Sequence, residues 1–177
     1  MRFGKIKNWL LIGGEDIILE AAIFLQRKDQ QLMFVTGERN LNFCLRNGLT
    51  LKENLKKNNI QYHLSNDINT DKLVLNYICK STIALSLGSP WIFKKFFIEK
   101  FGNRIINLHE ANLPKNRGGG TLSWNILMKL KKSSSVLHIV TPEIDGGDIV
   151  SKLDYYFPSN LCTPEDYTEI IHSNSLS

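Results

Sequence analysis

The stretch IINLHEANLPKNRGGGTLSW, residues 105–124, decides how the rest of the chain is interpreted. It begins with a short apolar run that is typical of a buried strand and that ends in Asn107 and His109. Because side chains alternate along a strand, both are expected on one face, at the end where the strand leaves the sheet. A loop with proline, Arg117 and three glycines follows, and it leads into a helical pattern.

Short apolar runs alternate with longer segments of helical period before this stretch. The expected strands are 9–14, 31–37, 60–65, 81–88 and 105–109, and the expected helices are 15–28, 49–59, 69–80 and 90–102. This alternation predicts an α/β fold with a mostly parallel sheet and helices on both faces. In such sheets ligands bind outside the carboxyl ends of the strands.

Local chemistry supports the helix boundaries. We expect Asn69 or Thr70 to cap the third helix, Pro90 to lie in the first turn of the fourth, and Gly102 to end it. A further helix is expected after the glycines, over 121–132, with Thr121 as its cap.

Antiparallel strands are expected near the carboxyl terminus. The serines at 133–135 are interpreted as a break, and they are followed by a strand at 136–140, a turn at 141–148 and a return strand at 149–157. No internal repeat or low-complexity linker interrupts the 177 residues, so a single domain is expected.

The composition is that of an ordinary globular protein, with 42% hydrophobic and 22% charged residues. No apolar run is long enough to span a bilayer, and the short apolar patch near the amino terminus lacks a cleavage site, so we expect a cytoplasmic protein. The three cysteines stand far apart without zinc spacing, and no metal is expected. A net charge of +5 permits an anionic ligand, although the lysines are scattered.

Asn107 and His109 form a candidate catalytic pair because they can meet one substrate. An amide donor can polarise a carbonyl and stabilise the negative charge that develops on its oxygen, while an imidazole can exchange a proton with the attacking or leaving group. This combination suits acyl transfer. The alternative is that His109 is a structural histidine at a strand end.

The turn TPEIDGGD, residues 141–148, contributes a third candidate. A carboxylate beside an imidazole makes the ring more basic and fixes its tautomer, so Asp145 could orient His109 or a water molecule. Spacing alone leaves Asp148 as a competitor. The alternative is an Asp-Gly hairpin turn without a function.

Gly118, Gly119 and Gly120 directly precede the expected helix, where free amides favour an anion, and Arg117 would add a cation. The alternative is a flexible loop with an incidental arginine. The remaining histidines have no partners in the sequence and are expected to be structural or exposed; they are His63, His138 and His172.

Together, NLHEANLPKNRGGG (107–120) and EIDGGDIV (143–150) resemble the formyltransferases that use 10-formyltetrahydrofolate. The resemblance covers nearly the whole chain and implies one catalytic domain with a three-layer, Rossmann-like fold. It also implies that Asn107 holds the formyl carbonyl, that His109 transfers the proton, and that Asp145, rather than Asp148, keeps His109 and a bound water in register.

The same resemblance implies a folate site on two segments. It assigns the pteridine ring to the strand-to-helix loop with Leu87, Gly88, Pro90, Trp91 and Ile92, and to the backbone from Val140 to Ile144. Plain core packing is the alternative for these residues.

The loop LPKNRGGGTLSW is most similar to that of enzymes that formylate dTDP-linked aminosugars for surface polysaccharide, and it implies that Arg117 and Gly118 to Gly120 contact the nucleotide sugar. A homodimer is compatible with the family, whereas no nucleic-acid or membrane partner is expected. UDP-aminoarabinose, glycinamide ribonucleotide and initiator tRNA stay open as acceptors. Family members continue beyond a segment like TPEDYTEI, so the carboxyl terminus is expected to be truncated, and an inactive remnant that binds only folate stays open as well.

Overall fold

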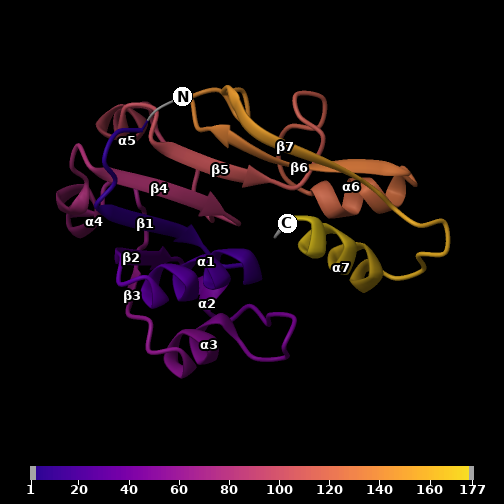
Figure 1. Ribbon diagram of the computed structural model, residues 1–177, viewed down its shortest axis with the longest axis horizontal. Coiled ribbons are helices and arrows are strands. Elements are labelled where there is room, and N and C mark those ends of the chain that lie inside the picture. Colours follow the sequence, from indigo (N-terminus) through magenta and orange to yellow (C-terminus); the bar gives the residue numbers. More distant parts are fainter. Residues whose placement is uncertain (1–2, 176–177) are drawn as a thin grey trace. The chain divides into compact units, whose positions relative to one another are not determined.

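The computed structural model describes residues 3–175. These residues form two compact units that divide between Ile106 and Asn107. Figure 1 labels their helices and strands. Among residues 3–175, no helix combines the length and the apolar character needed to cross a membrane.

The first unit is an α/β unit with a parallel sheet. Its strands are β1 (Asn8–Gly13), β2 (Gln31–Thr36), β3 (Tyr62–Leu64) and β4 (Thr82–Leu87), and its helices are α1 (Asp16–Arg27), α2 (Glu38–Leu41), α3 (Leu51–Lys57), α4 (Lys72–Tyr77) and α5 (Lys95–Phe101). The four strands pair in the order β3-β2-β1-β4, and all three pairings are parallel. From β1 to β3, each new strand is added on the same side of the previous one, whereas β4 is added on the other side of β1. Connections between parallel strands are right-handed, so this reversal of direction places α1 and α4 on opposite faces of the sheet.

The core of this unit surrounds β1, whose Leu10, Leu11 and Ile12 are completely buried. A strand that is covered on both faces is continuously apolar in this way. Helix α1 adds its own apolar stripe, which includes the buried Ile18 and Ala22.

The carboxyl ends of β1 and β4 meet closely at the point where the strand order reverses. Gly13 has a φ of 140°, and a Cβ atom there would lie 1.6 Å from the carbonyl oxygen of Leu87. Only glycine fits this contact. The strand ends that this contact joins are the place where open α/β sheets bind ligands.

The second unit carries the antiparallel strands. Strand β5 (Ile105–His109) enters it and is followed by α6 (Thr121–Leu127), β6 (Lys132–Ile139), β7 (Ile149–Tyr156) and α7 (Pro164–Ser175). Strands β6 and β7 pair antiparallel, with an irregularity between Leu137 and His138. The predicted α/β class, with parallel strands first and antiparallel strands near the carboxyl terminus, is therefore confirmed.

Three of the predicted helix starts are wrong. Asp71, rather than Asn69 or Thr70, caps α4, because its side chain accepts hydrogen bonds from the main-chain amides of Leu73 and Val74. Helix α5 begins at Lys95, so Pro90 lies in the loop before it, and Gly120 rather than Thr121 is the N-cap of α6. The predicted end of α5 at Gly102 is confirmed, since this residue adopts the left-handed conformation with φ 51°.

The serines at 133–135 do not break the chain, because all three lie in β6 and are buried. Two of them have polar partners: Ser134 donates to Asp154 at 2.6 Å, and the hydroxyls of Ser135 and Ser175 lie 2.5 Å apart. The predicted helix over 121–132 consequently ends early, at Leu127. Helix α7 extends through Ser175 and so includes residues 171–175 of the polar segment at the carboxyl terminus; residues 176 and 177 lie outside the described range.

Candidate active site

Asn107 and His109, at the carboxyl end of β5, reach the same group of polar side chains. Nδ1 of His109 lies 3.6 Å from a carboxylate oxygen of Asp145, and Nδ2 of Asn107 lies 3.3 Å from Nε2 of His138. His138 is in turn 3.4 Å from the other carboxylate oxygen of Asp145. The structure thus brings together the three residues that the sequence singled out for catalysis.

Asp145 is held by an unusual turn between β6 and β7. Its φ of 46° is in the left-handed region, which aspartate tolerates better than most residues. Gly147 is required nearby, because a Cβ atom there would lie 1.9 Å from the carbonyl oxygen of Ile139. Asp148, the competing candidate, contributes its main-chain carbonyl to the hydrogen bond with the Ile139 amide. The turn therefore directs Asp145 toward the two histidines.

His138 is the site residue that the sequence analysis missed. It is buried and its ring stands nearly perpendicular to that of His109, at an interplanar angle of 82° with 6.3 Å between centroids. Its Nδ1 lies 3.0 Å from the carbonyl oxygen of Ile139, and its Nε2 faces both Asn107 and Asp145. The alternation of β6 could have flagged a polar side chain among apolar neighbours, but only the fold supplies its partners.

The surroundings of Asp145 favour its ionised form. Its pKa is lowered from 3.8 to about 2, chiefly by the hydrogen bond from His138, although partial burial acts in the opposite direction. The main-chain amide of Gly118 also donates to this carboxylate at 2.8 Å, and His109 and His138 add electrostatic attraction. A carboxylate that is ionised throughout the neutral range can orient an imidazole and stabilise its protonated form.

The loop that follows β5 folds over His109. Nε2 of His109 lies 2.7 Å from the main-chain carbonyl oxygen of Asn116. The next residue, Arg117, forms an ion pair with Glu143, and Gly118 binds Asp145 through its amide. Three consecutive loop residues therefore contact β5 or the turn that carries Asp145.

The predicted anion site at the glycines is only partly available. The amide of Gly118 is already engaged by Asp145, and helix α6 has only seven residues. The main chain of Gly119 and Gly120 leads into this helix, and Gly120 has a φ of 76°. The run serves chiefly to shape the loop, and whether it contacts a substrate is a prediction.

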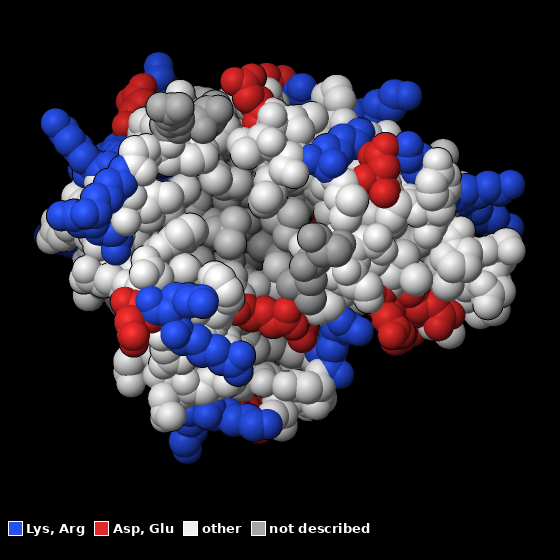
Figure 2. All heavy atoms as spheres, in the orientation of Figure 1, with Lys and Arg blue, Asp and Glu red and all other residues white. Residues whose placement is uncertain are grey.

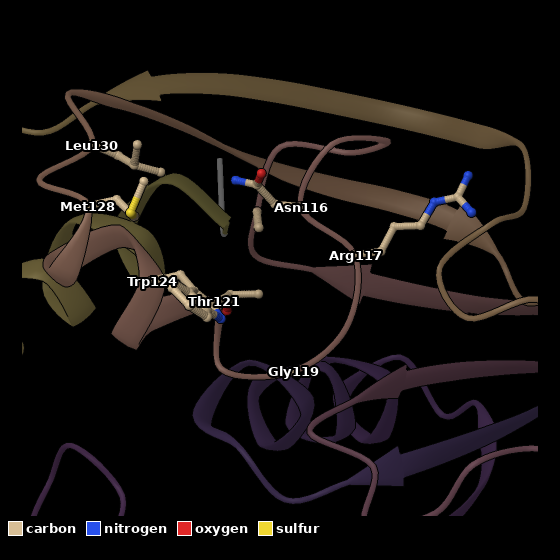
Figure 3. A pocket seen from close by; sticks show the side chains of 8 residues that line it. Asn116, Arg117, Gly119, Thr121, Trp124, Met128 and Leu130 are labelled. Carbon is tan, nitrogen blue, oxygen red and sulfur yellow. The ribbon is translucent and has the colours of Figure 1, made fainter.

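A pocket of about 310 Å³ lies beside this loop (Figure 3). Its lining residues are Ala111, Asn116, Arg117, Gly119, Thr121, Trp124, Met128 and Leu130. Asn116, Met128 and Leu130 lie along one side and Trp124 and Thr121 along the other, whereas the Arg117 side chain extends away from them (Figure 3). Because Asn116 also contacts His109, the pocket adjoins the candidate catalytic group.

In the first unit, the predicted folate loop begins at the carboxyl end of β4. Leu87 is buried, whereas Gly88 adopts a φ of 62° and its carbonyl accepts the Asn40 side chain at 2.8 Å. A Cβ atom on Gly88 would lie 2.5 Å from the carboxylate of Glu15. Burial, followed by the charge of Asp16, raises the pKa of Glu15. Leu87 therefore packs in the core, and Gly88 provides bare backbone at the strand ends.

The remainder of that loop is more exposed. The ring of Pro90 and the indole of Trp91 lie close to Gly37, and the Trp91 indole N–H donates to the carbonyl of Asn66 at 3.1 Å. Ile92 is 73% exposed. An apolar side chain held in solvent by an ordered loop is available to a ligand.

The second predicted folate segment also contains one buried and one exposed residue. Val140 is buried, whereas Ile144 is 56% exposed next to Asp145. Ile144 can contact a ligand that approaches Asp145. Within residues 3–175, no group of three or more His, Cys, Asp or Glu side chains is arranged to hold a metal ion.

No family model matches the chain. Curated relatives match over part of it: methionyl-tRNA formyltransferase of Mycoplasma genitalium is 35% identical over 77 residues, which are 43% of this chain and 24% of that protein. Phosphoribosylglycinamide formyltransferase of Haemophilus influenzae is 28% identical over 93 residues, which are 51% of this chain and 44% of that protein. The chain thus spans less than half of either relative.

Solved structures match over nearly the whole chain. Glycinamide ribonucleotide transformylase 1 from Symbiobacterium toebii has a TM-score of 0.71 at 16% identity, over 97% of this chain and 83% of that one. An N-formyltransferase from Helicobacter canadensis, solved with folinic acid and dTDP-3-aminofucose, has a TM-score of 0.71 at 23% identity, over 96% of this chain and 60% of that one. At these identities, the likeness shows that the chain shares the fold of formyltransferases.

Proposed function

We propose that this protein transfers the formyl group of 10-formyltetrahydrofolate to the amino group of a dTDP-linked amino-dideoxy sugar, a step in surface polysaccharide synthesis. The observation that carries the proposal is the convergence of Asn107, His109 and Asp145 beside a pocket. An amide donor, an imidazole and an orienting carboxylate are the groups that acyl transfer to an amine requires.

Asn107 is the donor for the carbonyl oxygen in this proposal. The folate supplies a formyl carbonyl that an amine can attack, and negative charge then develops on the formyl oxygen. The amide of Asn107 carries two N–H bonds, and its nitrogen lies 3.3 Å from His138. His138 can fix the amide orientation while the other N–H points to the formyl oxygen.

His109 transfers the proton in this proposal. Nδ1 faces Asp145, which would hold a proton on that nitrogen and leave Nε2 to accept one from the amine. Nε2 is covered by the Asn116 carbonyl at 2.7 Å, so the amine has to take over this contact. As the bond to the folate nitrogen breaks, the same imidazole can return the proton to that nitrogen.

The residues predicted to hold the folate offer apolar surface and bare main chain to a flat ring. Exposed Ile92 and Ile144 offer apolar surface, and Gly88 offers main chain without a side chain. Trp91 and Pro90 stiffen the loop that carries Ile92. Leu87 and Val140 are buried, each within its own unit.

The choice of acceptor rests on one solved structure and on one loop of the sequence. The Helicobacter canadensis structure contains dTDP-3-aminofucose and folinic acid, and it shares the fold over 96% of this chain. The glycine-rich loop after Arg117 is the element whose sequence favours a nucleotide sugar. Glycinamide ribonucleotide, UDP-aminoarabinose and initiator tRNA are the competing acceptors, and the curated relatives include methionyl-tRNA formyltransferases.

The charges on the face drawn in Figure 2 do not favour a nucleic-acid module. Despite the net charge of +5, Figure 2 shows Lys and Arg in several separate groups on the face drawn, with Asp and Glu between them. A polyanion is bound most tightly by a continuous basic stripe.

The test is an acceptor competition with purified protein. The protein, 10-formyltetrahydrofolate and equal amounts of dTDP-4-amino-4,6-dideoxyglucose, UDP-aminoarabinose, glycinamide ribonucleotide and initiator methionyl-tRNA are incubated, and the formylated products are quantified by mass spectrometry. We expect the dTDP-sugar to be formylated fastest. Faster formylation of another acceptor would identify that compound as the substrate instead. If the protein binds folate tightly but forms no product with any acceptor, it is a binding protein and not an enzyme.

Variants test the assigned roles in the same assay. His109→Ala is expected to lower turnover by about 10²–10⁴-fold and Asn107→Ala by about 10²–10³-fold, with the fold unchanged by circular dichroism. His63→Ala is the matched control because His63 pairs with Asp71 in the other unit. Near-normal turnover in either site variant would contradict its role.

A further inference from the structure

The pocket beside the glycine-rich loop contains a group of residues that the proposed mechanism leaves unused. Trp124, Met128 and Leu130 give it an apolar wall, and Asn116 and Thr121 add polar side chains. We propose that this pocket holds the sugar ring of the acceptor, with the indole of Trp124 as the platform for the ring's C–H face. The proposal rests on the function proposed above and identifies a residue that determines acceptor specificity.

The position of the pocket points to the sugar rather than to the nucleoside. The reactive amine is attached to the sugar ring, so the ring has to lie next to the group that takes the proton. Asn116 lines the pocket and its carbonyl is 2.7 Å from Nε2 of His109. The nucleoside is separated from the sugar by a diphosphate, which places it farther from the imidazole.

The size of the pocket agrees with a single ring. Its 310 Å³ is at the lower end of the roughly 300–1,000 Å³ that small-molecule sites occupy. A sugar ring with its substituents fits this space, whereas a complete nucleotide sugar has to extend beyond it.

The chemistry of the wall suits a deoxygenated sugar. Trp124 is 59% exposed and Met128 is 62% exposed, although both are large apolar side chains. The C–H bonds of a pyranose ring carry small positive charges that are attracted to the negative face of an indole. An amino-dideoxy sugar has fewer hydroxyls, so it presents more apolar surface to such a wall, and Asn116 and Thr121 can bind the hydroxyls that remain.

The glycines keep the indole accessible. A Cβ atom at Gly120 would lie 3.8 Å from Cδ1 of Trp124, so any longer side chain in that direction would cover the ring edge. A Cβ atom at Gly119 would meet nothing within 4 Å, and this residue lines the open pocket. The absence of side chains at Gly119 and Gly120 therefore leaves Trp124 accessible.

Kinetics with matched variants test the proposal. Trp124→Ala is expected to raise KM for dTDP-4-amino-4,6-dideoxyglucose by about tenfold or more while kcat changes little, because only binding of the ring is lost. Trp124→Phe should restore most of the affinity. Leu127→Ala is the control, since Leu127 is on the same helix and 72% exposed but does not line the pocket. Equal KM values for Trp124→Ala and Leu127→Ala would overturn the proposal.

A binding experiment separates this inference from the proposed activity. The chain has three tryptophans, so 5-fluorotryptophan labelling gives three fluorine resonances, and Trp124→Phe identifies that of Trp124. Without folate, the dTDP-sugar should shift this resonance and dTDP alone should not. An equal shift with dTDP would overturn the sugar assignment, even if the enzyme formylates the sugar. A sugar-dependent shift without any product would support the pocket and contradict the formyl transfer.

Discussion

The main-chain carbonyl oxygen of Asn116 lies 2.7 Å from Nε2 of His109, while the opposite nitrogen of the same ring faces Asp145. Both ring nitrogens therefore face oxygens. A neutral imidazole has only one N–H and can satisfy one of them, whereas the protonated ring can satisfy both. An amine that delivers a proton to Nε2 therefore competes with the Asn116 carbonyl for this nitrogen.

Acceptor binding is expected to change the environment of Nε2 in His109. In protein with ¹⁵N-labelled histidine, dTDP-4-amino-4,6-dideoxyglucose should shift the Nε2 signal of His109 because the amine replaces the Asn116 carbonyl. His63 should stay unaffected, since it pairs with Asp71 in the other unit. An unchanged His109 signal under conditions that yield product would contradict direct proton transfer to Nε2.

Asp145→Asn is expected to lower the free energy of unfolding at neutral pH but to have a smaller effect in acid. The pKa of Asp145 is about 2 in the folded protein and 3.8 ordinarily, so its ionised form stabilises the fold. This stabilisation is fully present above the ordinary value and is lost as pH falls toward 2. In urea unfolding at a series of pH values, the difference between wild type and Asp145→Asn should shrink over this range. Asp148→Asn is the control, because its described contact is through the main chain.

The same substitution tests the orienting role of Asp145. Asp145→Asn should lower turnover and change its dependence on pH, because the amide cannot stabilise a protonated His109 as the carboxylate does. An identical pH profile in wild type and variant would exclude this role.

His138→Ala tests a positioning role. Its loss removes the partner of Asn107 and one of the partners of Asp145, so we expect the free energy of unfolding to fall by about 1–3 kcal/mol. The pKa of Asp145 should rise, since His138 is the largest cause of its lowering, and carbon NMR of the carboxylate measures this directly. His138→Gln should recover part of the turnover. A stability loss with an unchanged Asp145 titration would leave His138 with a packing role alone.

Gly147→Ala is expected to disturb the site from two residues away. Its Cβ atom would lie 1.9 Å from the main chain of Ile139, and such overpacking costs about 1–3 kcal/mol. The displaced turn moves Asp145, so turnover should fall together with the melting temperature. Gly119→Ala is the matched stability control, because its added Cβ atom meets nothing within 4 Å. A wild-type melting temperature in Gly147→Ala would contradict the predicted strain.

Arg117 and Glu143 should affect substrate binding more than stability. Their ion pair is solvent-exposed, and such pairs contribute about 0–1 kcal/mol. If Arg117 contacts the diphosphate, Arg117→Ala raises KM for the dTDP-sugar, and Glu143→Gln lowers it by releasing the guanidinium. Equal KM values in both variants would show that Arg117 does not contact the acceptor.

The strand and helix pattern could be predicted because it depends on local periodicity, as for the apolar run of β1. Cap residues were harder to predict, since Asn69, Thr70 and Asp71 all have suitable side chains and only the backbone geometry selects Asp71. Ser134 and its neighbours looked like a chain break because their partners, such as Asp154, are distant in sequence.

In the candidate site, too, the features set by local sequence could be predicted and those set by distant residues could not. Asn107 and His109 could be paired from strand alternation alone, whereas spacing left Asp148 open beside Asp145 and only the resemblance to formyltransferases favoured Asp145. His138 could not be assigned, because its importance comes from its distances to Asn107 and Asp145. Trp124 looked like an ordinary helix residue, and its exposure beside a pocket becomes apparent only once the loop is folded.

The groups proposed to handle the proton and the pocket proposed to hold the sugar come from one continuous stretch, between Asn107 and Asp145. The candidate acceptor contacts are therefore encoded separately from the strand ends of the first unit, which are predicted to contact the folate. New acceptor preferences could evolve, or be engineered, by exchanging the loop from Ala111 to Thr121 and helix α6, with residues 1–106 left unchanged.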